Sequence, residues 1–434
     1  MTDVIVVGAG ISGLAAAWRL QQAGVEVVML ESGTRAGGRF HSLHVNGCVM
    51  EAGANFVTDA YRVIPRLADQ VGLSWRTVTD RNAVAIDGQL HAFTSARPLS
   101  AIRSGLMSWP TALSQIPGLL RFALAGRNRG TVDPCDWLLA DQTLAPQWAA
   151  QSGLAQMVER SWRPAFNGFY FQDTAPSSAA AVAAMASHGV RQQTETLSGG
   201  LSTLTDAMAA HLDIRYRVTA TAVDESASGV VVATNQGDWR AGHVIVALPG
   251  PALRRLSVPS IPLATKLAGS SYSAGLLVGL GMDRHLTPDE LGGAYGILMH
   301  PGEAPLAALC VASRSGHADD TRDLVTCMFT DEFARRLASK TDSELVDAAR
   351  HALLRWAPGL RGAVASDPAC HKVIRLPHAM PMSPPGRLAT IADYRRHADH
   401  RRVSLAGDSL AWPWSDSAAF AGEDAAQRLL QINW

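Results

Sequence analysis

The chain has 434 residues, of which 47% are hydrophobic and 18% are charged. This composition is that of a globular protein long enough for two or three domains, and it excludes a disordered, collagen-like or coiled-coil chain. The 38 basic residues balance the 38 acidic ones, so the charge gives no indication of a nucleic-acid partner.

The cysteines and the N-terminal sequence give information about the cellular compartment in which the protein resides. The five cysteines are scattered without a C-x-x-C pair, which predicts neither a disulfide framework nor a metal site. The chain opens without a basic leader, and it has no apolar run of the ~18 residues that a membrane span needs. We therefore predict a cytoplasmic protein without a bound metal.

The first 31 residues follow a dinucleotide-binding pattern. Residues 4–7 predict a buried strand, 14–20 a helix, and 25–30 a second strand that ends at an acid. The G-x-G-x-x-G sequence before the helix allows a tight turn and close approach of a diphosphate to the helix N-terminus. An acid at this strand end accepts ribose hydroxyls and disfavours a 2′-phosphate, which leaves FAD and NAD as alternatives. The candidate cofactor-binding residues are Gly8, Gly10, Ile11, Ser12, Gly13, Glu31 and Ser32.

The next segment distinguishes between these two dinucleotides. Arg35-Ala36-Gly37-Gly38-Arg39 follows Glu31 closely, and Glu51-Ala52-Gly53-Ala54 follows one strand later. These motifs resemble the flavin-containing amine oxidoreductase superfamily, whose R-x-G-G-R element passes along the FAD diphosphate and ribityl chain. Glycines permit that backbone approach, an arginine can pair with phosphate oxygens, and a small turn leaves room for the flavin ring. The resemblance implies noncovalent FAD, with contacts from Arg35, Gly37, Gly38, Arg39, Gly53, Ala54 and Asn55.

The resemblance continues along almost the whole chain. The turn at 198–201 and the segments 243–249 and 403–408 resemble later elements of the family's cofactor domain, and Arg217-Val218 is expected to open a strand beside adenine. A helix beginning near Ser417, with Asp416 as its N-cap, would point its N-terminus at the flavin pyrimidine ring and stabilise negative charge there. The contacts implied in this part of the chain are Val218, Gly407, Asp408, Asp416, Ser417 and Ala418.

The resemblance implies an α/β fold with a Rossmann-like FAD-binding domain and a discontinuous α+β substrate domain. The FAD domain is expected at 1–95, 190–255 and 385–434, and the substrate domain at 96–189 and 256–384. The first insert shows helical patterns at 111–125 and 144–160. The second insert predicts β-rich stretches at 274–280 and 295–313 and a helix at 344–356. The apolar stretch 104–126 is predicted to be buried or to line a pocket, rather than to contact a membrane surface.

Aromatic residues dominate the candidate substrate side. Residues 164–171 and 295–298 resemble the protoporphyrinogen oxidase branch of the family, and such rings can line a pocket for a flat apolar substrate. Simple core packing is the alternative for each of them. The substrate-binding candidates are Phe56, Phe166, Phe169, Tyr170, Tyr295 and Trp414.

Two departures from the monoamine oxidases limit the expected chemistry. Their lysine near flavin N5 would fall near Gly275 or Leu276, and the nearest lysine is Lys266. Amine oxidases also place two aromatic rings beside the substrate amine. Trp414 fits one of these positions, and Trp412 is the alternative residue for it. The other position falls near Ala379, with a histidine beside it. The catalytic candidates are Trp414, facing the flavin, and His378, as a general base or hydrogen-bond partner.

The sequence therefore predicts a FAD-dependent oxidoreductase. Its substrate would be a small, largely apolar amine or heterocycle that gives a hydride to flavin N5 and forms a C=N or C=C bond. Oxygen or another electron acceptor would complete the cycle, and the sequence leaves the oligomeric state open. Two alternatives stay open: a flavin-dependent desaturase or isomerase of an isoprenoid or tetrapyrrole-like substrate, and a non-catalytic FAD-binding partner.

Overall fold

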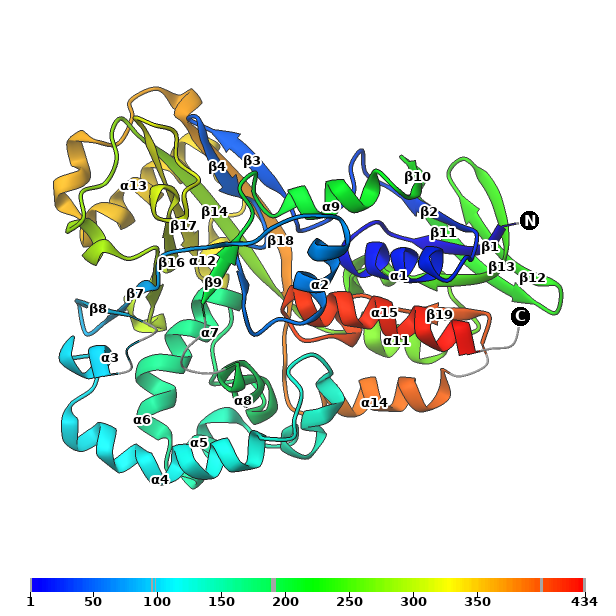
Figure 1. Ribbon diagram of the computed structural model, residues 1–434, viewed down its shortest axis with the longest axis horizontal. Helices are drawn as coiled ribbons and strands as arrows, with labels where there is room; N and C mark the ends of the chain where they lie inside the picture. Colours follow the sequence, from blue (N-terminus) through cyan, green and yellow to red (C-terminus); the bar gives the residue numbers. More distant parts are fainter. Residues whose placement is uncertain (1, 95–96, 98, 189–192, 399–400, 432–434) are drawn as a thin grey trace.

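The structure is a computed structural model that describes residues 2–94, 97, 99–188, 193–398 and 401–431. Two seven-stranded sheets organise this part of the chain, with a group of helices beside the second sheet (Figure 1). The elements of the first sheet come from distant parts of the sequence, so the candidate site is assembled only by tertiary folding.

The first sheet has a parallel centre that all three predicted cofactor segments build. Its order is β10-β2-β1-β13-β12-β11, with β19 also paired to β13. Val4 lies opposite both Val27 and His243, which fixes the register of the centre. The strands are β1 (Thr2–Val7), β2 (Val27–Glu31), β10 (Asp213–Tyr216), β11 (Ala220–Ser226), β12 (Gly229–Thr234), β13 (Gly237–Val246) and β19 (Val403–Leu405). Because residues 4–7 of β1 and 244–246 of β13 are buried, they read as apolar runs, and the strands predicted there are confirmed.

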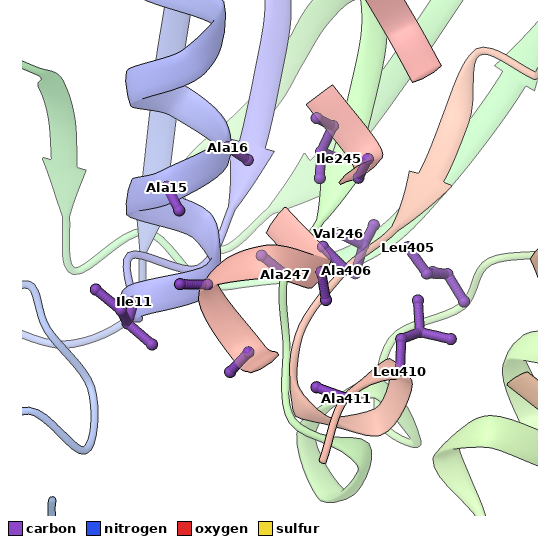
Figure 2. Close-up of a cluster of buried hydrophobic side chains, with 14 of the residues drawn as sticks. Ile11, Ala15, Ala16, Ile245, Val246, Ala247, Leu405, Ala406, Leu410 and Ala411 are labelled. Carbon is purple, nitrogen blue, oxygen red and sulfur yellow. The ribbon is translucent and has the colours of Figure 1, made fainter. Parts of the chain in front are cut away.

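Helices α1 (Ile11–Gln22) and α15 (Ser415–Gln431) pack against each other on this sheet. A Cβ at Gly422 would lie 1.9 Å from the carbonyl oxygen of Ser12, so only glycine allows this approach. Figure 2 shows the small side chains Ala15 and Ala247 where α1 meets the end of the sheet. The remaining helices of this half are α2 (Val63–Gln70), α9 (Ser202–Ala209), α10 (Gly250–Leu253), α11 (Leu263–Ala268) and α14 (Arg387–His397).

The second sheet has the order β18-β14-β17-β16-β15-β7-β8. Its strands are β7 (Arg81–Ile86), β8 (Gln89–Thr94), β14 (Tyr272–Met282), β15 (Gly296–Met299), β16 (Leu306–Val311), β17 (Asp323–Phe329) and β18 (His371–Pro381). The first FAD segment was expected to reach residue 95, but β7 and β8, which precede that residue, pair within this second sheet. The rest of the division into domains stays a prediction. Helices α12 (Asp331–Arg336) and α13 (Asp342–Trp356) cover one face, and a capping box between Thr341 and Glu344 starts α13.

Besides the two large sheets, the described residues form two smaller β-structures. Strands β3 (Ser42–Val45) and β4 (Cys48–Glu51) form a hairpin, and β5 (Val57–Thr58), β6 (Arg76–Thr77) and β9 (Thr194–Thr196) form a three-stranded sheet.

The helical insert departs from its predicted pattern in two places. It contains α3 (Leu99–Arg103), α4 (Trp109–Gly126), α5 (Ala145–Ser152), α6 (Ala155–Met157), α7 (Arg163–Tyr170) and α8 (Ala179–Ser187). The helix predicted at 144–160 is broken by Gly153, whose φ of 73° ends α5. The prediction that 104–126 is buried or lines a pocket is wrong for the outer side of α4, where Trp109, Leu113, Ile116, Leu120 and Leu124 are exposed and only Gln115 and Gly118 of the helix are buried. Leu106 and Met107, which precede the helix, are buried. None of the described helices is long and apolar enough to cross a bilayer.

Candidate active site

The glycine-rich turn leaves room beside the N-terminus of α1. Gly8 has a φ of 98°, and a Cβ at Gly13 would lie 1.9 Å from the carbonyl oxygen of Gly8, so both glycines are needed for the turn itself. Gly10 differs, because a Cβ there would meet no atom within 4 Å. Gly10 also caps α1 without a side-chain hydrogen bond. The turn therefore offers open space and helix-end N–H groups, which is the environment that a diphosphate requires.

Glu31 lies at the end of β2 and faces this turn. Its carboxylate oxygens accept hydrogen bonds from the backbone N–H of Ala9 at 2.8 Å and of Gly33 at 2.7 Å. The N–H of Val218 donates to the Glu31 carbonyl at 3.0 Å, which places Val218 beside the acid. The expectation that Arg217 and Val218 open a strand is wrong: they lie between β10 and β11, and Arg217 has a φ of 60°.

Arg35 stabilises the loop that follows Glu31. Its guanidinium donates to the carbonyls of Ala36 at 2.8 Å, Phe40 at 3.1 Å and Gly38 at 2.6 Å. The N–H of Gly37 donates to the Ala9 carbonyl at 2.8 Å, which brings the loop against the glycine-rich turn. The Arg35 side chain thus shapes the backbone next to Gly10, and its contact with the cofactor stays a prediction.

Arg39 joins the N-terminal and C-terminal cofactor segments. Its guanidinium forms an ion pair with Asp408 and donates to the Ala379 carbonyl on β18. The Tyr272 hydroxyl donates to the other Asp408 oxygen at 2.7 Å and accepts from the Gly250 N–H at 2.8 Å. The carboxylate of Asp408 is therefore engaged on both oxygens, and the two segments of the predicted site are held together by charge.

Three further hydrogen bonds lie where these segments meet. The N–H of Gly407 donates to Ser12 Oγ at 2.9 Å, directly at the start of α1. A Cβ at Gly53 would lie 1.9 Å from the carbonyl oxygen of Arg39, and the Ala54 N–H donates to that carbonyl at 2.9 Å. Asn55 donates from Nδ2 to the Gly53 carbonyl at 2.9 Å. The small residue at 53 is thus required by the Arg39 backbone.

Asp416 does not cap its own helix as predicted. Helix α15 begins at Ser415, and the Asp416 carboxylate accepts the N–H groups of Arg62, Val63 and Ile64 at 2.9, 2.7 and 2.8 Å. It therefore caps α2, whose N-terminus packs against α15. Ser417 Oγ is also engaged, because it donates to the Val132 carbonyl at 2.6 Å. The contribution of 416–418 to a cofactor site would accordingly come from backbone N–H groups.

Aromatic side chains from three separate segments form a continuous series, which we call the aromatic wall. Phe56 contacts Phe169 with ring centroids 5.1 Å apart, Phe169 contacts Tyr170 at 6.0 Å, and Tyr170 contacts Trp414 at 5.8 Å. Trp412, which is fully buried, stacks on Trp414 with ring centroids 5.3 Å apart.

The other two substrate candidates lie next to the aromatic wall. Phe166 is fully buried and contacts Tyr170 at 5.3 Å, which is the position of a core side chain. The hydroxyl of Tyr295 donates to the Asn55 carbonyl at 3.3 Å and so connects β15 to the turn that follows Gly53.

The structure does not bring the two catalytic candidates into one cluster. His378 is exposed on β18 and contacts the ring of Tyr272 at 6.2 Å. Desolvation and the charges of Arg254, Arg335 and Arg255 lower its pKa. Its neighbour Ala379 is buried on the opposite face of the strand and accepts the Arg39 hydrogen bond.

The region near Gly275, where the monoamine oxidase lysine would fall, is closely packed. A Cβ at Gly275 would contact Ala379 at 3.3 Å and Phe171 at 3.4 Å. Lys266 lies on α11 and is exposed.

Sequence reasoning missed three polar residues that the fold places at this site. Tyr272 connects Asp408 to the second sheet, although it begins a plain apolar strand in the sequence. Glu51 is buried, accepting from Ser42 Oγ and from the Leu201 N–H at 2.7 Å each, and burial raises its pKa to about 7. His188 lies edge-on to Trp414 at 5.0 Å, and burial lowers its pKa to about 4. The contacts with Asp408, Leu201 and Trp414 join residues more than 100 positions apart, so no local pattern predicts them.

Comparison with known proteins places this arrangement in a family. The family model described as flavin containing amine oxidoreductase matches residues 11–430. Coproporphyrinogen III oxidase of Mycobacterium leprae is 27% identical over 456 residues, which cover 97% of each chain. Among solved structures, putrescine oxidase bound to putrescine has a TM-score of 0.77 at 19% identity over 99% of each chain. Cyclohexylamine oxidase from Brevibacterium oxydans has a TM-score of 0.69 at 18% identity over 98% of each chain.

The two solved structures show the shared fold, and the family match covers nearly the whole chain, from the first residue of α1 to the last turn of α15. The chain therefore belongs to the flavin-containing amine oxidoreductase family and is an FAD-dependent oxidoreductase.

Proposed function

We propose that this enzyme dehydrogenates a C–N or C–C bond of a small, uncharged and largely apolar amine or heterocycle. The aromatic wall carries the proposal, because it presents rings from Phe56, Phe169, Tyr170 and Trp414 beside the turn that holds Asn55. Rings in this arrangement favour a flat apolar molecule. The names of the relatives, which include a coproporphyrinogen oxidase and amine oxidases, support a substrate that is a nitrogen heterocycle or an amine.

The residues around the glycine-rich turn fit the diphosphate and adenosine of FAD. The space beside Gly10, the N-terminus of α1 and the carboxylate of Glu31 supply room, N–H donors and a hydroxyl acceptor. The ion pair of Arg39 and Asp408 and the first turn of α15 would hold the opposite end. Bound FAD supplies the capacity to accept a hydride from carbon.

The protein's own residues would bind and orient the substrate and exclude water. Trp414 is 4% exposed, and its Nε1 donates to the Thr131 carbonyl at 3.1 Å, so its ring is fixed. His188 beside it stays neutral at neutral pH, which keeps this part of the wall uncharged. An uncharged wall offers no counter-ion to a cationic amine, and we therefore favour a neutral form of the substrate. A role of His378 as base stays a prediction, since its side chain is exposed beside Tyr272.

We also propose that an acceptor other than oxygen completes the cycle. The position of the monoamine oxidase lysine near Gly275 is occupied by closely packed backbone and apolar side chains. Stopped-flow reoxidation of the reduced enzyme in air is expected to be slow compared with reoxidation by a quinone or dye. Equal rates with oxygen and with the best artificial acceptor would contradict this.

Anaerobic titration of the purified, FAD-loaded enzyme tests the main proposal. A panel of neutral amines and dihydro-heterocycles is added without oxygen, and loss of the flavin absorbance is followed. At least one member of the panel is expected to bleach the band. A band that stays oxidised throughout the panel would refute the proposal.

Two matched variants separate the aromatic wall from general packing. Phe169 belongs to the wall, whereas Phe122 contacts Trp148 and Trp162 in the helical insert; both are partly buried phenylalanines on helices. Phe169→Ala is expected to lower the rate of flavin bleaching, or the affinity for the substrate that bleaches it, by at least about tenfold, because a ring contact with the substrate is lost. Phe122→Ala is expected to keep both. Equal losses in the two variants would show that the wall does not bind the substrate.

A further inference from the structure

A histidine follows the buried helix α8 and lies beside the aromatic wall. Ser178 caps the N-terminus of α8, because its side chain accepts the Ala181 N–H, and residues 179–185 are all buried. At the other end of the helix His188 is the C-cap, and its backbone N–H donates to the Met185 carbonyl at 3.2 Å. The histidine is therefore attached to a helix that the core surrounds, which fixes the position of its ring.

The two ring nitrogens of His188 lie in different environments. Nδ1 is 3.1 Å from the Met185 carbonyl oxygen, and because a carbonyl can only accept, Nδ1 carries the hydrogen. Burial lowers the pKa of this ring to about 4, so the ring is neutral at neutral pH. A neutral imidazole with its hydrogen on Nδ1 has a free lone pair on Nε2. Within the described residues, no group forms a hydrogen bond with this Nε2.

The His188 ring lies at one end of the aromatic wall. It is edge-on to Trp414, with ring centroids 5.0 Å apart and an interplanar angle of 77°, and it contacts the ring of Tyr61 at 5.9 Å. Since Nδ1 faces the carbonyl at the end of α8, Nε2 faces away from that carbonyl. The Nε1–H of Trp414 is already used by the Thr131 carbonyl. A hydroxyl such as that of Tyr170 can donate as well as accept, whereas Nε2 of His188 can only accept.

We propose that Nε2 of His188 accepts a hydrogen bond from the substrate and selects molecules whose nitrogen carries a hydrogen. This inference rests on the proposed function and narrows its substrate class to neutral primary or secondary amines and to heterocycles with an N–H group, such as pyrrole-type rings. A bound molecule without that hydrogen excludes water from Nε2 and leaves the nitrogen without a partner, which weakens binding. The aromatic wall thus supplies affinity for a flat apolar molecule, and His188 supplies the discrimination.

Binding of three probes to the oxidised, FAD-loaded enzyme tests this inference separately from dehydrogenation. The probes are indole, 1-methylindole and benzofuran, which share a flat bicyclic shape and of which only indole has an N–H group. Binding is followed by the change in the flavin absorbance spectrum. The wild type is expected to bind indole at least about tenfold more tightly than either of the other two. Equal affinity for all three would overturn the inference and leave the proposed function standing, whereas no binding of any probe would overturn both.

Substitutions of His188 assign the preference to its ring nitrogen. His188→Phe keeps an edge-on ring and removes the acceptor, so it is expected to lower the affinity for indole about tenfold, to that for 1-methylindole. The affinity for 1-methylindole should change by less than about twofold. His188→Gln, which offers an amide oxygen, should restore part of the preference for indole.

The chain offers a matched control outside the aromatic wall. His211 lies edge-on to Trp18 with ring centroids 6.0 Å apart, and His211→Phe should leave all three affinities unchanged. Flavin absorbance and the melting temperature report whether each variant is folded. A folded His188→Phe enzyme that keeps the wild-type preference for indole would overturn the inference, as would an equal loss of that preference in His211→Phe.

Discussion

Replacing Asp416 by alanine tests whether this carboxylate holds α2 against the C-terminal helix. The side chain is 1% exposed, and it accepts the N–H groups of Arg62, Val63 and Ile64. Alanine would leave these three donors without that acceptor, and the N–H groups of Val63 and Ile64 are buried. An orphaned buried N–H costs roughly 1–3 kcal/mol, so the lower value for three donors gives a loss of about 3 kcal/mol.

The loss would be measured as the free energy of unfolding in urea, with FAD in excess and far-UV circular dichroism as the readout. Asp416→Asn keeps one acceptor oxygen at the same place and is expected to lose roughly half as much as alanine. FAD should also dissociate faster from Asp416→Ala, because the first turn of α15 is no longer fixed. A free energy of unfolding for Asp416→Ala within about 0.5 kcal/mol of wild type would refute the assignment of this carboxylate as the cap of α2.

Three further variants test burial and packing at the site. Burial raises the Glu51 pKa from 4.5 to about 7, so protonated Glu51 stabilises the fold below pH 4.5 and this stabilisation is lost as the pH rises to about 7. Glu51→Gln should remove about 3 kcal/mol of this pH dependence from the free energy of unfolding. Parallel curves of stability against pH for the variant and the wild type would contradict this. Burial lowers the His188 pKa to about 4, so the stabilisation from its neutral form is fully present above pH 6.5 and is lost as the pH falls towards 4. His188→Asn should therefore reduce the fall in the free energy of unfolding between pH 6.5 and 4. An unchanged fall would exclude His188 as its source. Gly422→Ala should lower the free energy of unfolding in urea by roughly 1–3 kcal/mol, because its Cβ would meet Ser12. Gly126→Ala, whose Cβ would meet nothing within 4 Å, should be neutral or slightly stabilising. Equal effects of the two variants would argue against a close contact between α1 and α15.

The cofactor half of this protein follows from local signals. The strand, glycine turn, helix, strand and acid of the first 31 residues are found where the pattern predicts them, as β1, α1 and β2 with Glu31 at the strand end. Glycine positions carry this information because backbone conformation and close approach depend on the residue itself. Gly8 and Gly13 are needed in any chain that folds this turn.

The partners of charged and polar side chains could not be predicted in the same way. Arg35 donates to three carbonyls of its own loop, which the residue pattern did not predict, and Asp416 was expected to cap α15 and instead caps α2. In both cases the residue type was right for a strong hydrogen bond, but several acceptors or donors were within reach of the chain. For Asp416, the partner depends on packing between segments more than 350 residues apart.

Burial of the apolar segment at 104–126 was mispredicted for a related reason. Its composition is that of a core helix, and composition does not say whether a second layer covers the outer face. Only the packing of α4 through Phe122 on one side, with Trp109 and Leu113 left exposed on the other, decides this.

By itself, the sequence determined the nucleotide-binding turn and the order of the elements, because glycines, strand periodicity and a strand-end acid act over a few residues. The choice of FAD over NAD rested on the family resemblance of residues 35–39 and 51–54. Only the tertiary structure decided that Arg39 meets Asp408, that rings from 56, 169–170 and 414 form one wall, and that α4 faces outward. Those contacts join residues far apart in the chain, and their geometry is set by the packing of whole helices and sheets.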